Sequence, residues 1–175
     1  MDDDKVEVVY RNNELEQFRQ DILAGNLCDI FLPVSFIRAD GYIGAVYDMQ
    51  GYERYSGLRS VKASTLIGAV TSIMEKSRQG DRRYIFSGEY SLDPALVFVN
   101  TRIPDAALIY RRTEPMSRRV VLDCLKHLLQ PDHADVRGAD YIRKALFILS
   151  DSHRSFEIIR HDLMAVGTEA FRAEC

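Results

Sequence analysis

The chain contains 175 residues, of which 46% are hydrophobic and 28% are charged, and its formal net charge is -3. This balance excludes a disordered chain, and the length is that of one domain with a sizeable core. The acidic balance argues against general binding to nucleic acid, and no run approaches the roughly 18 apolar residues of a membrane helix. The acidic start over 2–4 is unlike a secretory signal, and three cysteines at long spacings are unlike a disulfide framework. We therefore expect one cytoplasmic domain over 1–175.

The first predicted elements are a strand and a short helix. Residues 5–10 are rich in β-prone side chains. Asn13, followed three residues later by Glu16, has the pattern of a capping box, which predicts the start of a helix. Apolar side chains then recur at helical spacing. Gly25-Asn26 suit the left-handed conformation that ends a helix.

A β-hairpin is predicted next. Apolar residues alternate through 32–36, Asp40-Gly41 suit a two-residue turn that needs positive φ, and a second strand follows over 43–48. Residues 51–57 are expected to form the connector that leaves the sheet. Tyrosines in this region have two interpretations: an exposed patch that anchors a partner, or burial inside the hairpin and connector. They are Tyr42, Tyr47, Tyr52 and Tyr55.

A long helix and three short strands follow the connector. Helical spacing of apolar residues predicts a helix over 64–80. Short apolar runs predict strands over 84–91, 96–100 and 107–111, with turns between them. These runs are expected to form a small β element.

The last third of the chain has helical spacing throughout. Three helices are predicted from residue 117 onward, with breaks at Pro131 and 150–152. The predicted fold class is therefore α+β. A sheet-containing part spans about 5–58, and a mostly helical part spans about 59–170.

The segment from Ser91 to Asn100 resembles the catalytic loop of protein kinases. That loop reads His-Arg-Asp-Leu-x-Pro-x-Asn before apolar strand residues, and here Leu92 and Pro94 match. Ser91 stands at the position of the catalytic aspartate and Leu96 at that of the metal-binding asparagine. Neither side chain supplies the base or the metal ligand that phosphoryl transfer requires.

Two further kinase elements have no counterpart. Tyr110, with Arg111 and Arg112, lies where kinases place the metal aspartate of Asp-Phe-Gly. No glycine-rich loop precedes the first helix, and Lys5 cannot be assigned as the phosphate-pairing lysine. The resemblance implies a reduced protein-kinase-like (pseudokinase) fold with no catalytic residues, no cofactor and no metal site.

Several short segments together resemble a bacterial domain of unknown function that commonly lies amino-terminal to an FHA domain in Gram-positive bacteria. They are residues 23–26, 31–34, 40–41, 47–51 and 92–100. That family is similar to the kinase-like cytoplasmic domain of a type VII secretion component. The resemblance implies a non-catalytic scaffold that binds another protein in a signalling or secretion-associated assembly. The FHA domain itself has no counterpart in these 175 residues.

Two other functions are weighed against the scaffold. Four arginines flank residues 113–117 and suit an anion or phosphopeptide site, although a solvated loop has the same composition. They are Arg111, Arg112, Arg118 and Arg119. An enzyme of an unrecognised class would use Asp93 or Glu89 as acid or base.

A metal site is not expected from the histidines. Four of them occur only in the helical half, and none forms a metal-binding pair one helical turn apart. The candidates for such a site would be His127, His133, His153 and His161, with Asp132 or Asp162.

Overall fold

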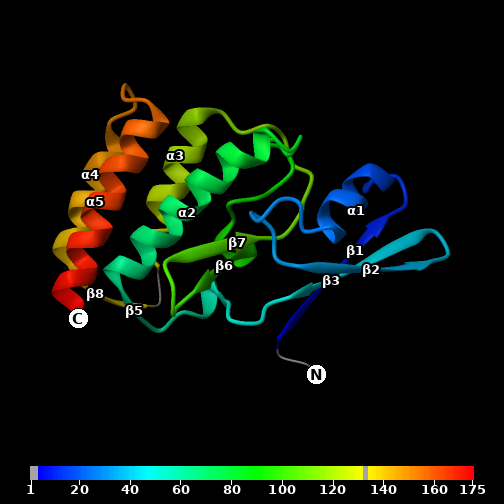
Figure 1. Cartoon of the computed structure of the whole chain (residues 1–175), viewed down its shortest axis with the longest axis horizontal. Coiled ribbons are helices and arrows are strands. Elements are labelled where there is room, and N and C mark those ends of the chain that lie inside the picture. Colours follow the sequence, from blue (N-terminus) through cyan, green and yellow to red (C-terminus); the bar gives the residue numbers. More distant parts are fainter. Residues whose placement is uncertain (1–3, 132–133) are drawn as a thin grey trace.

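The computed structural model describes residues 4–131 and 134–175 and confirms the α+β fold class. Its elements, in chain order, are β1 (Lys5–Arg11), α1 (Gln17–Ala24), β2 (Val34–Ala39), β3 (Tyr42–Asp48), β4 (Glu53–Arg54), η1 (Tyr55–Gly57), β5 (Ser60–Lys62), α2 (Ala63–Asp81), η2 (Pro94–Leu96), β6 (Val97–Asn100), β7 (Asp105–Leu108), α3 (Arg118–His127), β8 (Asp135–Arg137), α4 (Ala139–Ser150) and α5 (Phe156–Glu174). Figure 1 shows α2, α3, α4 and α5 grouped at one end and the sheet of β1, β2 and β3 at the other. The predicted division into parts at about residue 58 stays a prediction.

The N-terminal sheet has the strand order β1-β3-β2 and is antiparallel throughout. The predicted hairpin is confirmed: Ala39 pairs with Tyr42, and Gly41 has a φ of 82°. The predicted helix cap is wrong, because α1 has Glu16 at its N-cap and no side-chain cap. The helix ends as expected, with Asn26 in the left-handed conformation.

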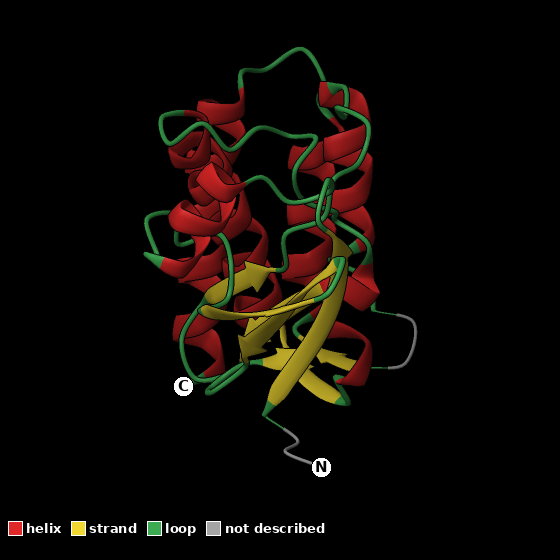
Figure 2. Ribbon diagram, turned by 90° about the vertical axis from the view of Figure 1, so that its right-hand side faces the viewer, coloured by secondary structure: helices red, strands yellow, loops and turns green. Residues whose placement is uncertain are grey.

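A second antiparallel sheet has the order β4-β6-β7, and β5 pairs with β8 in a parallel ladder. Figure 2 shows the strands together in the lower half of the molecule. The third predicted strand begins earlier than expected, at Asp105. Neither β5 nor β8 was predicted, since three residues are too few to show an alternating pattern.

The predicted strand over 84–91 is wrong. Tyr84 has a φ of 61°, and the Ile85 N–H donates to the Gly80 carbonyl at 3.0 Å, so the chain turns back at the end of α2. Only Tyr90 pairs, in an isolated bridge with Tyr110. Ile85 and Tyr90 are nevertheless buried, which explains why a packed loop has the apolar composition of a strand.

The core is built around α2, which packs against α4, α5 and β7. Its fully buried side chains include Leu66, Ile67 and Ile73. At Gly68, an added Cβ would lie 2.2 Å from the Pro104 Cβ in the turn between β6 and β7. The absence of a side chain at Gly68 therefore lets α2 approach this turn closely.

The first turn of α2 is capped from the far end of the chain. None of its own side chains caps it, but Glu174 at the end of α5 accepts hydrogen bonds from the Ala63 N–H at 3.0 Å and the Ser64 hydroxyl at 2.5 Å. A carboxylate at this position satisfies free backbone donors and suits the positive end of the helix dipole.

Candidate functional site

Aromatic side chains fill the junction between the N-terminal sheet and the segment that follows β7. The Tyr10 hydroxyl donates to the Tyr110 carbonyl at 2.5 Å and lies 3.1 Å from the Tyr47 hydroxyl. The Tyr110 N–H donates to the Tyr47 hydroxyl at 3.3 Å, and the Phe31 ring lies 6.0 Å from the Tyr110 ring. All four side chains are buried. We call Tyr10, Phe31, Tyr47 and Tyr110 the aromatic junction.

Burial favours the neutral form of the tyrosine hydroxyls in this junction. It raises the pKa of the Tyr10 and Tyr47 hydroxyls above the ordinary value, and it raises the pKa of Tyr110 to about 12. The three hydroxyls therefore stay neutral near pH 7. In this form they can donate and accept hydrogen bonds to one another and to the backbone.

A buried ion pair continues the junction toward α1. Glu89 Oε1 lies 2.6 Å from Arg19 Nε and accepts from the Tyr110 hydroxyl at 3.4 Å. Glu89 Oε2 accepts from the Phe86 N–H at 3.0 Å. Glu89 lies in the loop that follows α2, and its ion pair with Arg19 links this loop to α1.

The kinase-like loop positions have packing and turn-forming roles. The Ser91 hydroxyl accepts from the Asp93 N–H at 3.1 Å, and the Asp93 carboxylate caps η2 by accepting from the Ala95 N–H at 2.9 Å. Leu92 is buried, and Leu96 is half-buried against the core. Tyr110, at the third position, belongs to the aromatic junction. The hydrogen bonds of Ser91 and Asp93 thus shape the turn, and Leu92, Leu96 and Tyr110 pack against the core.

The four arginines near residues 113–117 are exposed, and two of them make contacts on different elements. Arg112 lies 3.8 Å from Glu16 at the start of α1, whereas the Arg118 guanidinium lies 5.1 Å from the Phe156 ring centre at the start of α5. Arg111 and Arg119 are exposed on the same segment. Arg112 and Arg118 therefore do not converge on one anion.

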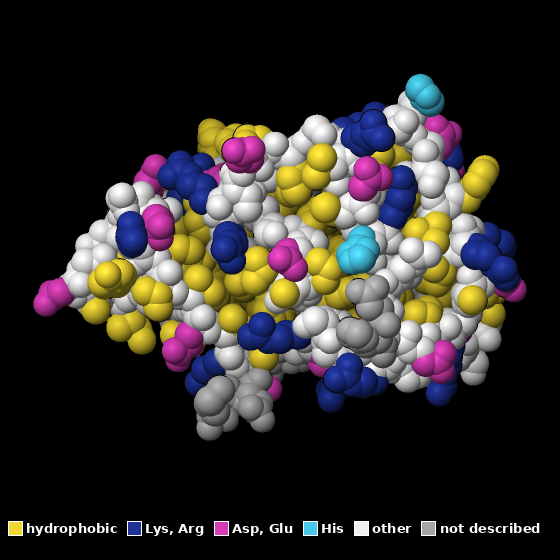
Figure 3. All heavy atoms as spheres, turned by 180° about the vertical axis from the view of Figure 1, so that it is seen from behind, with side chains coloured by type: hydrophobic (Ala, Val, Ile, Leu, Met, Phe, Trp, Pro, Cys, Tyr) yellow, Lys and Arg dark blue, Asp and Glu magenta, His cyan; other side chains and the backbone are white. Residues whose placement is uncertain are grey.

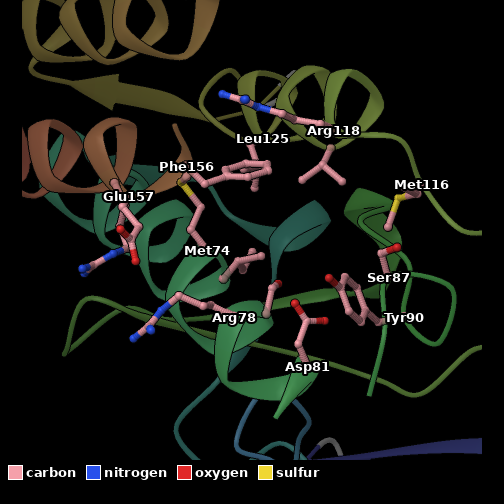
Figure 4. Close-up of a pocket in the computed structure, with 14 residues that line it drawn as sticks. Met74, Arg78, Asp81, Ser87, Tyr90, Met116, Arg118, Leu125, Phe156 and Glu157 are labelled. Carbon is pink, nitrogen blue, oxygen red and sulfur yellow. The ribbon is translucent and has the colours of Figure 1, made fainter. Parts of the chain in front are cut away.

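A cavity of about 320 Å³ opens between α2, α3, α5 and the segments that hold Ser87 and Met116 (Figure 4). Apolar side chains from three helices form much of its wall: Ile73, Met74, Val121, Leu125 and Phe156. Figure 4 shows Tyr90 facing the interior from the side opposite Phe156 and Leu125. Neither Glu89 nor Asp93 lines this cavity.

Polar groups lie at the edges of the cavity. Ser77, Asp81 and Ser87 line it. Figure 4 shows Asp81 and Ser87 close to Tyr90. Burial raises the pKa of the Tyr90 hydroxyl, and a hydrogen bond with the Ser77 side chain offsets part of this rise. An apolar wall with a few polar groups is the usual composition of a small-molecule or side-chain binding site.

Glu75 contacts two arginines that line the cavity, Arg78 and Arg160. Glu75 Oε1 accepts from Arg78 at 2.8 Å, and Glu75 Oε2 lies 3.4 Å from Arg160 Nε. The hydrogen bond from Arg78 and a second from Gln79 lower the pKa of Glu75 to about 2. One carboxylate thus links α2 to α5 through two arginines of the cavity lining.

This lowered pKa predicts an acid-dependent loss of stability. The folded-state pKa lies below the ordinary 4.5, so the stabilisation is present above pH 4.5 and is lost as the pH falls toward 2. We expect Glu75→Gln to lower the urea midpoint at pH 7 and to have little effect near pH 2. Urea unfolding at both pH values measures this. Equal effects of Glu75→Gln at the two pH values would contradict it.

The four tyrosines of the hairpin and connector differ in exposure. Tyr47 and Tyr55 are buried and Tyr42 is 52% exposed, while the half-buried Tyr52 donates to Asp105 at 2.5 Å. Burial in the hairpin and connector therefore accounts for most of these four tyrosines.

The predicted metal-site candidates include His133 and Asp132, which lie outside the described residues. Within the described residues, no group of three or more His, Cys, Asp or Glu could hold a metal ion.

No family model matches the chain. The comparison with curated proteins also gave no match. Among solved structures, one similar structure is the cytoplasmic fragment of ESSB from Staphylococcus aureus, with 11% sequence identity and a TM-score of 0.46. The similarity covers 90% of this chain and 81% of that chain. The sequence resemblance to the FHA-associated family stays a prediction. Over the described residues, no helix is long and apolar enough to cross a membrane.

Sequence reasoning did not find the cavity. Its wall combines residues such as Met74, Leu125 and Phe156, which are far apart in the chain and have the spacing of ordinary core positions. Only the packing of α2, α3 and α5 brings them together. Among the predicted site residues that the structure describes, Arg118 alone lines it.

Proposed function

We propose that this chain is a non-catalytic, kinase-like protein-interaction module of a bacterial, cytoplasmic signalling or secretion-associated assembly. The kinase-like loop supports this proposal, because its chemical positions hold Ser91 and Leu96, and Tyr110 stands at the position of the metal aspartate of Asp-Phe-Gly. The observed roles of these side chains are turn formation and packing.

The observation that carries the proposal is the filled aromatic junction. A protein kinase holds the phosphates and metal ions of its nucleotide between the sheet and the catalytic loop. Here Tyr110 stands at the expected metal-aspartate position and is only 2% exposed, with its backbone hydrogen-bonded to Tyr10 and Tyr47. A nucleotide would have to displace these rings and break their hydrogen bonds.

The cavity between α2, α3 and α5 supports the binding role. Its volume of about 320 Å³ is at the lower end of the range of known ligand pockets, and it suits one apolar side chain of a partner better than a large cofactor. Phe156, Met74 and Met116 provide an aromatic ring and flexible thioethers that adapt to such a side chain. Arg118 adds a positive charge to the cavity lining.

The test has two arms. In calorimetry, Mg²⁺-ATP should give no binding heat at millimolar concentration, and tight binding or transfer of the γ-phosphate would refute the proposal. In the native cell, affinity capture with mass spectrometry should recover a partner that is lost with Val121→Phe, which fills the cavity. Val120→Phe is the matched control, because Val120 is adjacent in α3 but exposed and does not line the cavity.

A further inference from the structure

The N-terminal sheet buries one face and leaves the other uncovered. Alternate side chains of β1, such as Val6 and Tyr10, point into the core. On the opposite face, Val9 is 67% exposed, Ile37 is 63% exposed and Tyr42 is 52% exposed. Figure 3 shows hydrophobic side chains at the surface of the part that holds this sheet. We call this uncovered side the outer sheet face.

Strand register places these exposed residues in one apolar row. Val9 of β1 and Ile37 of β2 both pair with Gly44 of β3, so the three residues lie across the sheet at the same level. The next outward positions on β3 are Tyr42 and Val46, one on each side of the row. Gly44 has no side chain, which allows another surface to approach the middle of the row closely.

Two opposite charges flank this row symmetrically. Glu7 and Arg11 lie on the same strand and the same face as Val9, two positions before it and two after it. Both are exposed, and within the described residues neither side chain makes a hydrogen bond or an ion pair. At about 3.4 Å per residue, each charge lies roughly 7 Å along the strand from Val9.

We propose that the outer sheet face binds a second copy of this chain. A two-fold axis in the interface, along the row and perpendicular to the strands, places Val9 over Val9 and Ile37 over Ile37 of the two copies. The same axis places Arg11 of each copy opposite Glu7 of the other and Tyr42 opposite Val46. The face is thus complementary to itself in both charge and hydrophobicity, as an isologous interface requires.

The size of the face makes this association weak. Three strands about 4.8 Å apart and six or seven residues long at about 3.4 Å per residue cover roughly 330 Å² per copy. Stable interfaces bury about 800 Å² per partner. We therefore expect a dissociation constant between roughly 10 µM and 1 mM for the chain alone.

Sedimentation equilibrium over this concentration range tests the proposal. The native chain should pass from monomer to dimer, and the double variant Val9→Thr/Ile37→Thr, which keeps β-branched residues in the strands, should dimerise at least tenfold more weakly. Phe147→Thr is the control, because Phe147 is 82% exposed on α4, away from the sheet, and should leave the equilibrium unchanged. Circular dichroism checks that each variant folds.

Charge exchange tests the orientation of the two copies. Arg11→Glu alone and Glu7→Arg alone each bring like charges together across the interface, so each should weaken the dimer. The double exchange Arg11→Glu/Glu7→Arg should restore it. A chain that stays monomeric up to 1 mM, or a dimer that Val9→Thr/Ile37→Thr does not affect, would overturn the proposal. A dimer that the two single exchanges weaken and the double exchange does not restore would overturn the arrangement.

Discussion

Gly68→Ala is expected to destabilise the fold by about 2–4 kcal/mol. The added Cβ would lie 2.2 Å from the Pro104 Cβ and 2.9 Å from its Cα. The Pro104 side chain is a rigid ring bonded to the backbone, so it cannot rotate away as a flexible side chain would. Either α2 or the turn between β6 and β7 must move, and α2 packs against α4, α5 and β7.

Urea unfolding at pH 7 measures this effect, with Gly57→Ala as the control. An added Cβ at Gly57 would have nothing within 4 Å, and φ there lies outside the left-handed region. We expect that variant to be neutral or slightly stabilising, because alanine restricts the unfolded chain. Similar midpoints for the two variants would show that α2 and the turn are not in the close contact described.

Arg19→Met is expected to lower the free energy of unfolding by about 2–4 kcal/mol. The change leaves the Glu89 carboxylate, whose side chain is only 10% exposed, without its charged partner. The Phe86 N–H and the Tyr110 hydroxyl remain as donors, so the cost falls below that of a fully isolated buried charge. The loss is expected to loosen α1 from the loop that follows α2.

Two controls separate this effect from loss of side-chain packing. The double variant Arg19→Met/Glu89→Leu should recover part of the stability, because no uncompensated charge remains. Arg143→Met, which breaks the ion pair with Asp140 on the surface of α4, should change the stability by less than about 1 kcal/mol. Thermal unfolding of all three variants gives the comparison. Equal effects of Arg19→Met and Arg143→Met would contradict a structural role for the buried pair.

The elements predicted from the sequence are those with a strong local signal. The β2–β3 hairpin depends on Gly41, whose backbone conformation is rare for other residues, and α2 and α5 have long runs of apolar residues at helical spacing. The segment over 84–91 lacks such a signal. Ile85 and Tyr90 in this segment are buried through contacts between distant parts of the chain, which have no periodicity in the sequence.

The predictable part of the candidate site is the set of positions where kinases have a base or a metal ligand, because the residue type alone shows whether a side chain can serve in that role. Ser91, Leu96 and Tyr110 stand at the positions of kinase ligands, and their side chains cannot serve as those ligands. Their contacts were not predictable, since Tyr110 meets Tyr10 and Tyr47 only through tertiary packing. The pairing of Glu89 with Arg19 likewise joins positions 70 residues apart.

The Glu174 cap makes the start of α2 depend on the last turn of α5. The two contacts span 111 and 110 residues of chain. During synthesis, α2 leaves the ribosome long before Glu174 is made, so its first turn lacks this cap until α5 has been completed. Contacts between residues so far apart in the sequence are also expected to slow folding. The first turn of α2 is thus capped later than the rest of the helix is made.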